Sequence, residues 1–524
     1  ATLPDGPVKN NVLNQLAAIE EKRIKTPAEN IRFKLNSRWF DRSVILEFLQ
    51  ENGYPDLRYV QSVQLEGDEM VSDTYHGGDG LFVGHRYGVV QRKDKETGEI
   101  RYEWDRKSGE NATGFPAQLE KYLNGARIGG KDSATANGYR EQMALLEDQF
   151  NKWIKTHDRY DELVAKYNDV FNSNIPYEHS GDPLGLKGLS GKRQPFDYQN
   201  SEVRRLSEDG RGILGFGTGL GKTTTALALE AFNYENGRST RTAYVVPKSV
   251  LENWYYEAKE FLSEEAFSNY LFVGLDVLMD GDQIRQVPVL NENGKPVLGT
   301  DGTPVMRDAL KLADEATITA RMNAIPHSNY RAVVFTKEQY ARIPLRDDTV
   351  DEHAQDMLYD FVAAGRVASA MDSDSHRKEA ARRRVLSEYS DTGTEKAEKY
   401  PYFEDMGFDS VIADEGHNYR NSYKNGREAS QLAYLPTSAV AQSARDMAIK
   451  NAYLMKKNGG RGPVLLTATP VVNTPIDAYN MLSHVLPKEY WQKMGIYSPD
   501  DFVKFFGKTR LETVQKISGE VEEK

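Results

Sequence analysis

The chain has 524 residues, of which 39% are hydrophobic and 28% charged, a composition typical of a globular protein with roughly two to four domains. It contains no cysteine, which excludes disulfides and zinc–thiolate sites. The net charge of −11 excludes a basic field over the whole chain, so a nucleic-acid groove has to be local; the acidity fits either solubility or binding elsewhere. Because we find neither an apolar run of about 18 residues nor a secretory signal, we expect no membrane partner and a cytoplasmic location.

Residues 1–175 carry no catalytic signature, and we predict an accessory α+β domain there. The predicted elements are helices over 11–25, 39–49 and 137–172 and a β-hairpin over 80–105. Asp41 is the expected N-cap of the second helix. The third helix carries an apolar stripe, which we interpret as ordinary packing, with a partner groove as the alternative. The stripe consists of Met143, Leu145, Leu146, Phe150, Trp153 and Ile154.

Residues 173–195 are rich in Pro, Gly, Ser and His and predict a linker. After it, short apolar strands alternate with helices, the pattern of a parallel sheet covered on both faces. The strands are predicted at 211–216, 241–247, 270–275, 330–336, 409–414 and 463–467, with helices at 223–233 and 251–262. This domain spans 176–510.

Two insertions interrupt the predicted sheet domain. The first, at about 280–325, contains Asn293-Gly294 and Asp301-Gly302 between valines, which predicts a β-ribbon. The second, at about 345–400, is long, charged and helical in pattern, and its Arg383 cluster fits a solvated helix face better than a DNA contact.

The segment 215–225 reads GFGTGLGKTTT between a predicted strand and a predicted helix. Glycines before a helix N-terminus let backbone N–H groups and the positive end of the helix dipole approach phosphate oxygens. Lys222 is expected to reach the β- and γ-phosphates, and Thr223 to offer its hydroxyl to Mg²⁺. Phe216 stands where the strict pattern has glycine. The residues expected to contact ATP are Thr218, Gly219, Gly221, Lys222, Thr223 and Thr224.

Asp414 and Glu415 follow the apolar strand Val411-Ile412-Ala413. Carboxylates at the carboxyl end of such a strand lie beside the phosphate loop in this type of sheet. We expect Asp414 to hold Mg²⁺ and Glu415 to orient or deprotonate the attacking water. The predicted catalytic residues are thus Lys222, Asp414 and Glu415; an isolated Asp-Glu pair would be a solvated turn.

Three further stretches carry weaker signals. Gln199, ahead of the loop, has an amide that can pair with an adenine edge and select ATP over GTP; the alternative is a surface glutamine. Thr467 and Thr469 end another apolar strand, where hydroxyls can sense the γ-phosphate or simply cap a loop. Lys248 and Ser249 open a helix after a strand and suit a nucleic-acid phosphate.

Together these motifs resemble the superfamily 2 helicases and, within them, the Swi/Snf-type double-stranded DNA translocases. The matching stretches are 198–199, 217–223, 244–254, 409–421 and 466–473. Gly416 stands where that family usually has alanine. The resemblance implies a RecA-like P-loop NTPase fold, ATP and Mg²⁺ as cofactors, duplex DNA as partner, and a coupling role for His417, Thr467 and Thr469.

A closer resemblance is to the helicase half of large phage antirestriction proteins that join an adenine DNA methyltransferase to such a motor. It rests on the stretches 33–39, 166–172, 183–190 and 403–409. It implies a role in antirestriction or in the passage of phage DNA into the host cytoplasm, packaging in a virion, and a methyltransferase module or virion proteins as partners. No Asn-Pro-Pro-Tyr-like methyl-transfer motif occurs in this sequence.

Too few residues follow Asn473 for the second RecA-like lobe of that family, and we interpret 511–524 as the start of a linker to it. Because an arginine from such a lobe can contribute about 10³–10⁵ in rate, we expect this chain alone to bind ATP and hydrolyse it weakly. Two alternatives remain: a virion or scaffold component that keeps the nucleotide fold without motor activity, and a motor that acts on RNA or protein.

Overall fold

The computed structural model describes most of the predicted sheet domain and several parts of the N-terminal region. The described residues are 20–21, 23–37, 39–54, 57–60, 80–83, 88–93, 100–105, 114–123, 133–172, 178–353, 356, 399–422, 441–471, 475–496, 499–506, 513–515 and 521–523. Most of the helix predicted over 11–25 and most of the insertion predicted over 345–400 lie outside these residues. None of the helices in the described ranges has the length and apolar character needed to span a bilayer.

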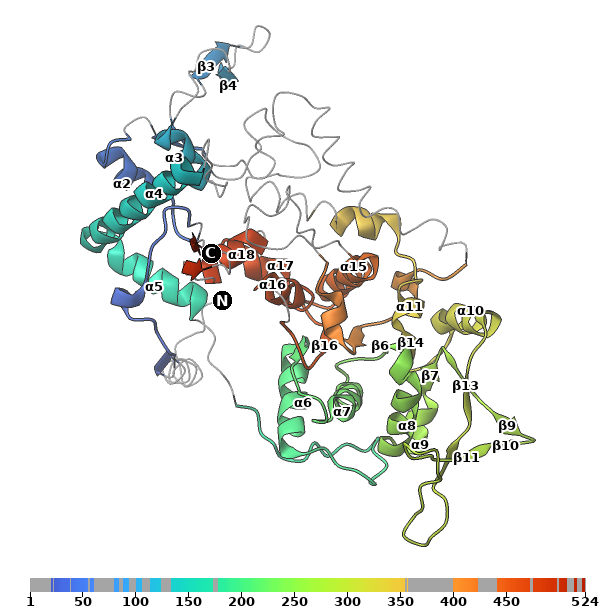
Figure 1. Cartoon of the computed structure of the whole chain (residues 1–524). Coiled ribbons are helices and arrows are strands. Elements are labelled where there is room, and N and C mark those ends of the chain that lie inside the picture. Colours follow the sequence, from blue (N-terminus) through green and yellow to red (C-terminus); the bar gives the residue numbers. More distant parts are fainter. Residues whose placement is uncertain are drawn as a thin grey trace, which may run out of the picture.

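The N-terminal region combines helices with two pairs of antiparallel strands (Figure 1). Its elements are η1 (Ala28–Asn30), α2 (Ser43–Glu51), β1 (Leu57–Val60), β2 (Gly80–Val83), β3 (Gly88–Lys93), β4 (Ile100–Asp105), α3 (Phe115–Leu123), α4 (Ser133–Trp153), η2 (Ile154–Thr156) and α5 (Tyr160–Phe171). The predicted hairpin corresponds to β3 and β4. The N-cap of α2 is Arg42 rather than the predicted Asp41, although Asp41 still accepts a hydrogen bond from the Ser43 N–H at 2.9 Å.

The predicted apolar stripe packs into one aromatic-rich core with α2 and α5. Phe33, Phe48 and Phe150 are fully buried there. Leu145 is an exception, since its side chain is 66% exposed. Packing against other helices accounts for the rest of the stripe, so the interpretation as ordinary core is confirmed.

Six parallel strands form the central sheet, which confirms the predicted α/β class. Their order is β5 (Gly212–Leu214), β16 (Pro463–Leu466), β15 (Ser410–Ala413), β6 (Thr242–Val246), β14 (Ala332–Thr336) and β7 (Tyr270–Phe272). Every predicted strand is present, and each is one to three residues shorter than predicted. The strand predicted at 270–275 ends at Phe272, and a separate strand begins at Leu275. Successive side chains of a strand point to opposite faces, and β6 accordingly sends Ala243 and Val245 to one core and Tyr244 and Val246 to the other.

Helices cover both faces of this sheet (Figure 1). One face packs against α6 (Asp197–Asp209), α7 (Lys222–Glu235), α8 (Leu251–Phe261) and α9 (Glu264–Ser268). The other packs against α10 (Glu315–Ala324), α11 (Lys337–Tyr340), α15 (Gln442–Lys457) and α16 (Pro475–Ser483). Short 3₁₀ turns join them at η3 (Lys248–Val250), η4 (Ile325–His327), η5 (Phe403–Asp405) and η6 (Gly416–Tyr419).

A buried ion pair fixes α7 against the sheet. Arg331, just before β14, donates to both carboxylate oxygens of Glu230 in α7, at 2.9 and 2.6 Å. Such a bidentate pair satisfies both charges in the interior. The helix that follows the phosphate loop is therefore held in one orientation.

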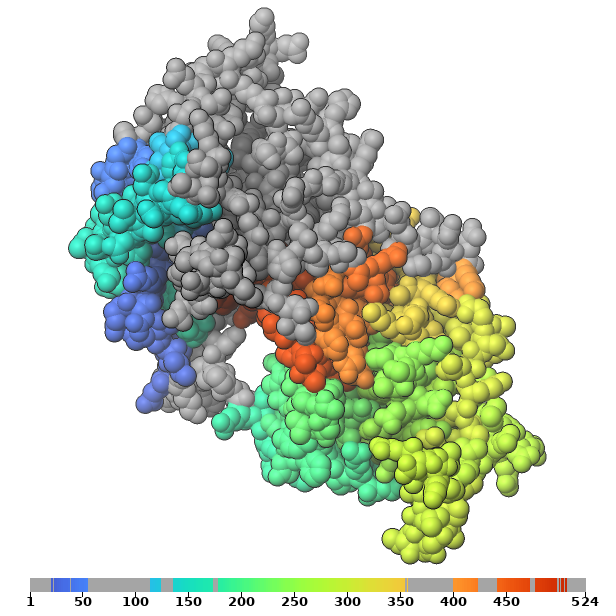
Figure 2. All heavy atoms as spheres, in the orientation of Figure 1, coloured from blue at the N-terminus to red at the C-terminus, as the bar shows by residue number. Residues whose placement is uncertain are grey.

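Most of the first predicted insertion, at about 280–325, is an antiparallel ribbon that projects from the sheet domain (Figures 1 and 2). Its predicted last part is instead α10, which packs on the sheet core. The ribbon comprises β8 (Leu275–Val277), β9 (Met279–Asp280), β10 (Gln283–Ile284), β11 (Gln286–Pro288), β12 (Met306–Asp308) and β13 (Leu310–Leu312). Gly294 and Gly302, at the two predicted turns, have φ of +71° and +78°, a conformation that glycine adopts without strain. Asp308 anchors the ribbon to α8 through Tyr255 at 2.8 Å and Lys259.

Two further segments join the parts of the chain. Leu184, Leu186 and Leu189 pack on the sheet core, so the described part of the predicted linker belongs to the sheet domain. The last helices are α17 (Lys488–Lys493) and α18 (Pro499–Phe506), followed by β17 (Thr513–Gln515) and β18 (Val521–Glu523). In α18, Phe505 stacks on Phe171 of α5 with ring centroids 4.4 Å apart, so the chain returns to the N-terminal region.

Candidate functional site

The phosphate loop joins β5 to α7 and is open to solvent. Thr218 and Gly219 are exposed, and Gly219 and Gly221 have φ of +83° and +75°. Gly221 is the N-cap of α7, and no side chain caps that helix. The N–H groups of a first helical turn have no partners within the helix, so this loop presents donors and a positive dipole end to an anion.

Lys222 and three threonines begin α7 directly behind the loop. The Lys222 ammonium donates back across the loop to the carbonyl of Phe216 at 3.4 Å. Thr225 donates to the carbonyl of Gly221 at 2.9 Å. Thr224 is buried and its hydroxyl has no hydrogen-bond partner. Thr223 is partly exposed at the helix start, as expected for a residue that reaches a bound metal.

Gln199 lies against the loop from α6, on which it is 2% exposed. Its amide nitrogen donates to the carbonyl of Leu220 at 3.1 Å, and its amide oxygen accepts from the Phe196 N–H at 2.9 Å. Tyr198 adds a hydrogen bond to the same Leu220 carbonyl at 3.1 Å. A side chain at Gly221 would meet the Gln199 amide at 2.2 Å. Gln199 therefore holds the phosphate loop in place; its expected contact with adenine stays a prediction.

Asp414 follows β15 and is partly buried. Its carboxylate accepts the indole N–H of Trp254 at 3.1 Å and the backbone N–H of Glu415 at 2.9 Å. Burial is the largest influence and raises the pKa of Asp414, and the charge of Glu415 raises it too. The two hydrogen bonds and the positive charge of Lys222 act in the opposite direction.

Glu415 begins a turn that brings it close to His417 and Thr467, two of the residues predicted to couple the nucleotide to DNA. It has φ of +50°, the one positive value for a non-glycine residue among those that the structure describes. His417 Nδ1 lies 3.1 Å from Glu415 Oε2 and 3.2 Å from the Thr467 hydroxyl. Thr467 is fully buried and accepts from the Thr469 N–H at 3.1 Å. The predicted coupling residues therefore form one connected group next to Glu415.

The sheet brings these segments to a single edge. In the parallel register Leu214 pairs with Leu466, and Ala413 pairs with both Leu465 and Val245. The residues that follow β5, β16, β15 and β6 therefore emerge side by side. The phosphate loop after β5 and the acidic pair after β15 therefore share this edge, and the positive charge of Lys222 acts to lower the pKa of Asp414.

Lys248 and Ser249 lie at the same edge, after β6, and both are exposed. They make no contact with the acidic pair that the structure records, so they belong to the rim of the site.

Sequence analysis missed Trp254 as a functional residue. The sequence signal that could have identified it is the run Asn253-Trp254 in a helix that packs on the sheet. A buried indole N–H usually has a hydrogen-bond partner, and that partner could have been sought among the predicted site residues.

The arrangement fits a magnesium–triphosphate. Thr223 and Asp414 supply the hydroxyl and carboxylate oxygens that Mg²⁺ prefers, with phosphate oxygens and water to complete an octahedron. The open glycine loop fits the phosphates: an added β-carbon at Gly215 or Gly219 would meet nothing within 4 Å. The unpartnered Thr224 hydroxyl leaves one further polar group close to the helix start.

Comparisons with known proteins show which sequences and structures this chain resembles. Residues 114–290 match the family model of the SNF2-related domain. The whole chain is 99% identical over 524 residues to "Defense against restriction protein B" of Escherichia phage P1, of which it spans 23%. A solved SWI2/SNF2 ATPase core of Sulfolobus solfataricus, in complex with double-stranded DNA, shares 13% identity with a TM-score of 0.30, covering 62% of this chain and 40% of that one. The last likeness is too low to carry an argument.

Proposed function

We propose that this chain, which carries SNF2-related sequence and spans about a quarter of the phage P1 protein it matches, is the first RecA-like lobe of an ATP-dependent double-stranded DNA translocase. The observation that supports this most is that Lys222 and the pair Asp414 and Glu415 follow strands of one parallel sheet at the same edge. An accessory domain over 1–175 precedes the lobe, which extends over 176–510 and leads into 511–524. A second RecA-like lobe, in the longer protein or in trans, completes the motor.

Each residue at the edge has a role in this proposal. Lys222 and the N–H groups of the glycine loop bind the β- and γ-phosphates. Thr223 and Asp414 hold Mg²⁺, which neutralises charge that develops on the phosphates. Glu415 orients a water and accepts its proton.

The change at the γ-phosphate on hydrolysis is coupled to the DNA-binding side of the lobe by the group formed by His417, Thr467 and Thr469. Thr467 joins the acidic turn to the end of β16, and its own N–H donates to the Leu214 carbonyl at 3.1 Å, just before the phosphate loop. One buried residue therefore contacts both segments, through its hydroxyl on the His417 side and its backbone N–H on the Leu214 side. Lys248 and Ser249 at the rim contact DNA phosphates.

The name of the phage P1 relative supports an antirestriction role for the complete protein, and the host cytoplasm is the location that we propose for it. We extend this to the passage of phage DNA into the cell, with a methyltransferase module and virion proteins as partners. The second candidate, a virion component without motor activity, is disfavoured because Lys222, Asp414 and Glu415 are all present and lie at one edge of the sheet.

The test is the ATPase rate of the complete longer protein with duplex DNA, with RNA and without nucleic acid. Stimulation by duplex DNA that Lys222→Ala abolishes is expected. Lys248→Glu should weaken DNA stimulation without changing ATP affinity, whereas Lys295→Glu, an exposed lysine of the ribbon, should change neither. No stimulation by any nucleic acid would favour the virion role, and stimulation by RNA alone a motor on RNA.

A further inference from the structure

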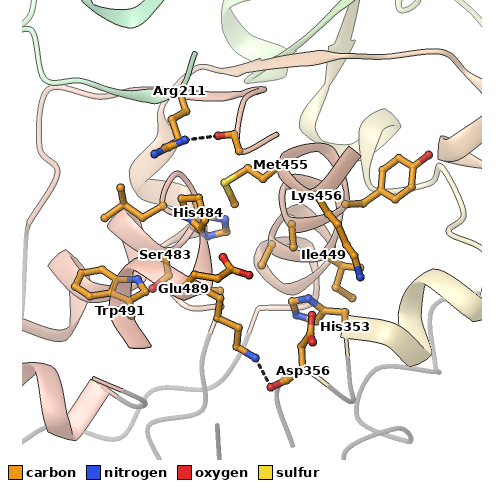
Figure 3. A pocket seen from close by; sticks show the side chains of 18 of the residues that line it. Arg211, His353, Asp356, Ile449, Met455, Lys456, Ser483, His484, Glu489 and Trp491 are labelled. Carbon is orange, nitrogen blue, oxygen red and sulfur yellow. Dashed lines mark hydrogen bonds between the residues drawn. The ribbon is translucent and has the colours of Figure 1, made fainter. Parts of the chain in front are cut away.

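A cavity of about 630 Å³ lies at the amino ends of the strands, with Arg211 and His484 in its wall (Figure 3). Charged side chains of this wall are already bound within the protein: Arg211 donates to the carbonyl of Gly460, and Lys456 pairs with Glu352. A charged ligand would have to displace these contacts. An exposed apolar surface lies elsewhere, on the ribbon that projects from the sheet domain (Figures 1 and 2).

The tip of the ribbon is built from an eight-residue sequence repeat. The triplets Pro-Val-Leu, Pro-Val-Leu and Pro-Val-Met begin at positions 288, 296 and 304. An Asn-Gly turn separates the first two triplets and an Asp-Gly turn the last two. Because self-similarity at a fixed spacing indicates equivalent structural units, the three triplets are expected to take equivalent positions.

The three triplets pair with one another in a closed triangle. The N–H of Val297 donates to the carbonyl of Val289, that of Val305 to Val297, and that of Val289 to Val305, each at 2.8 Å. The residues that flank the valines follow the same cycle of antiparallel pairs, which are Leu290 with Pro296, Leu298 with Pro304, and Met306 with Pro288. The backbone groups of the valines are thus used within the triangle, and what it presents to a partner is side chains.

One face of this triangle is apolar and exposed. Residues opposite each other in a strand pair share a face, and so do residues two apart along a strand. The cycle of pairs therefore places six side chains on one face, which we call the apolar face: Pro288, Leu290, Pro296, Leu298, Pro304 and Met306. All six are exposed, Leu290 to 54%, Leu298 to 59% and Met306 to 50%. Contiguous apolar surface of this kind marks an interaction site.

The charges around the apolar face favour a protein partner over a nucleic acid. The tip, residues 286–308, carries three acidic and two basic residues, which are Glu292, Asp301, Asp308, Lys295 and Arg307. Binding to nucleic-acid phosphates requires an excess of positive charge, and the tip has none. The surface that matches the apolar face is therefore an apolar surface of a protein.

The area of the apolar face favours a partner on the same polypeptide. Six partly exposed side chains of this size present on the order of 300 Å², whereas a stable complex of separate molecules buries roughly 800 Å² on each. A tethered partner needs less area, because tethering gives it an effective concentration of about a millimolar. The phage P1 protein that this chain matches offers such a partner, since the chain spans only 23% of it.

We propose that the apolar face docks on a part of the longer protein outside these 524 residues and holds that part beside the sheet domain. The ribbon is suited to this, because Asp308 bonds to Tyr255 and Lys259 of α8 and fixes its base. The same helix carries Trp254, which bonds to Asp414. The proposal requires only that the chain is part of such a longer protein, and it does not depend on motor activity.

The experiment compares the rate of maleimide labelling in the complete longer protein and in the 524-residue chain. The chain has no cysteine, so Leu298→Cys places a single thiol in it, on the apolar face. Trypsin cuts after Arg285 and Arg307 but not between Lys295 and Pro296, so mass spectrometry reads this position in one peptide from either protein. We expect labelling about tenfold slower in the complete protein, as for a face that is docked about 90% of the time.

Asp282→Cys is the matched control, because Asp282 is exposed on the same ribbon in the turn between β9 and β10, outside the apolar face. Its thiol should react at the same rate in both proteins. Adding Leu290→Glu to Leu298→Cys should restore fast labelling in the complete protein, since an unpaired charge opposes burial of the apolar face. The exposed position of Leu290 should keep the ribbon folded in this variant.

Equal labelling at position 298 in the two proteins would overturn the proposal. The same holds for equal slowing at position 282 and for a failure of Leu290→Glu to restore the rate. Labelling of the 524-residue chain that slows as its own concentration rises would overturn it in favour of a second copy. The ATPase rate with duplex DNA is measured separately, so failure of the motor proposal remains distinguishable from failure of this one.

Discussion

The indole N–H of Trp254 donates to the carboxylate of Asp414 over 3.1 Å, so a helix on one face of the sheet fixes the acidic residue at its edge. Trp254 itself is 2% exposed and cannot swing away without opening the core. The hydrogen bond opposes the effect of burial on the pKa of Asp414. The packing of α8 thus influences how readily the Asp414 carboxylate ionises.

Replacing Trp254 by Phe should weaken binding of ATP in the presence of Mg²⁺ about tenfold, because a hydrogen bond to a charged group is worth about 1.5–3 kcal/mol. The pKa of Asp414 would rise further, so the loss should be larger at pH 5.5 than at pH 8. Calorimetric titrations at both pH values measure this, with ATP and EDTA as the metal-free control. Equal losses with and without Mg²⁺ would contradict the assigned role.

Asp414→Asn should abolish hydrolysis and raise the free energy of unfolding at pH 7 by about 1 kcal/mol, as is common for groups kept for function. The sign follows from the raised pKa: the folded state binds a proton more readily than the unfolded state, so the ionised carboxylate costs stability above the folded pKa. The gain should fade as the pH drops through the pKa of Asp414 and be absent below the unfolded value. Urea unfolding of both proteins from pH 7 down to pH 4 tests it; a gain independent of pH would refute the explanation.

Gly416→Ala should destabilise the chain by about 1–3 kcal/mol, because the new β-carbon would meet the Leu465 β-carbon at 2.9 Å in a packed interior. Gly138→Ala in α4 is the matched control, since nothing lies within 4 Å of its added carbon and alanine favours helix. Thermal unfolding should move the two variants in opposite directions.

Gln199→Ala should reduce the affinities for ATP and for inorganic tripolyphosphate to a similar degree, about five- to tenfold. The reason is that both ends of the Gln199 amide bind backbone groups around the phosphate loop. Competition against a fluorescent ATP analogue measures both ligands. If ATP binding weakens while tripolyphosphate binding does not, Gln199 acts on adenine rather than on the loop.

The sequence by itself determined the type of fold and the position of the phosphate loop, and it supplied the residues predicted for the site. Short apolar strands separated by helical segments are typical of a sheet covered on both faces, so the six strands could be located by pattern. The glycine loop before Lys222 is a known phosphate-binding motif, so it could be located in the same way. The hairpin turns at Gly294 and Gly302 were equally predictable, because they depend on backbone conformation that glycine favours.

Only the tertiary structure decided how those residues are supported. The strand order, which sets β16 between β5 and β15, is decided by contacts between segments far apart in sequence, and it joins Thr467 to His417. The bonds from Trp254 to Asp414 and from Gln199 to Leu220 cross between elements and leave no local pattern. The same holds for the exposed Leu145 and for the cavity at His484, because burial depends on which neighbours the fold supplies and periodicity records only which side of a helix a residue occupies.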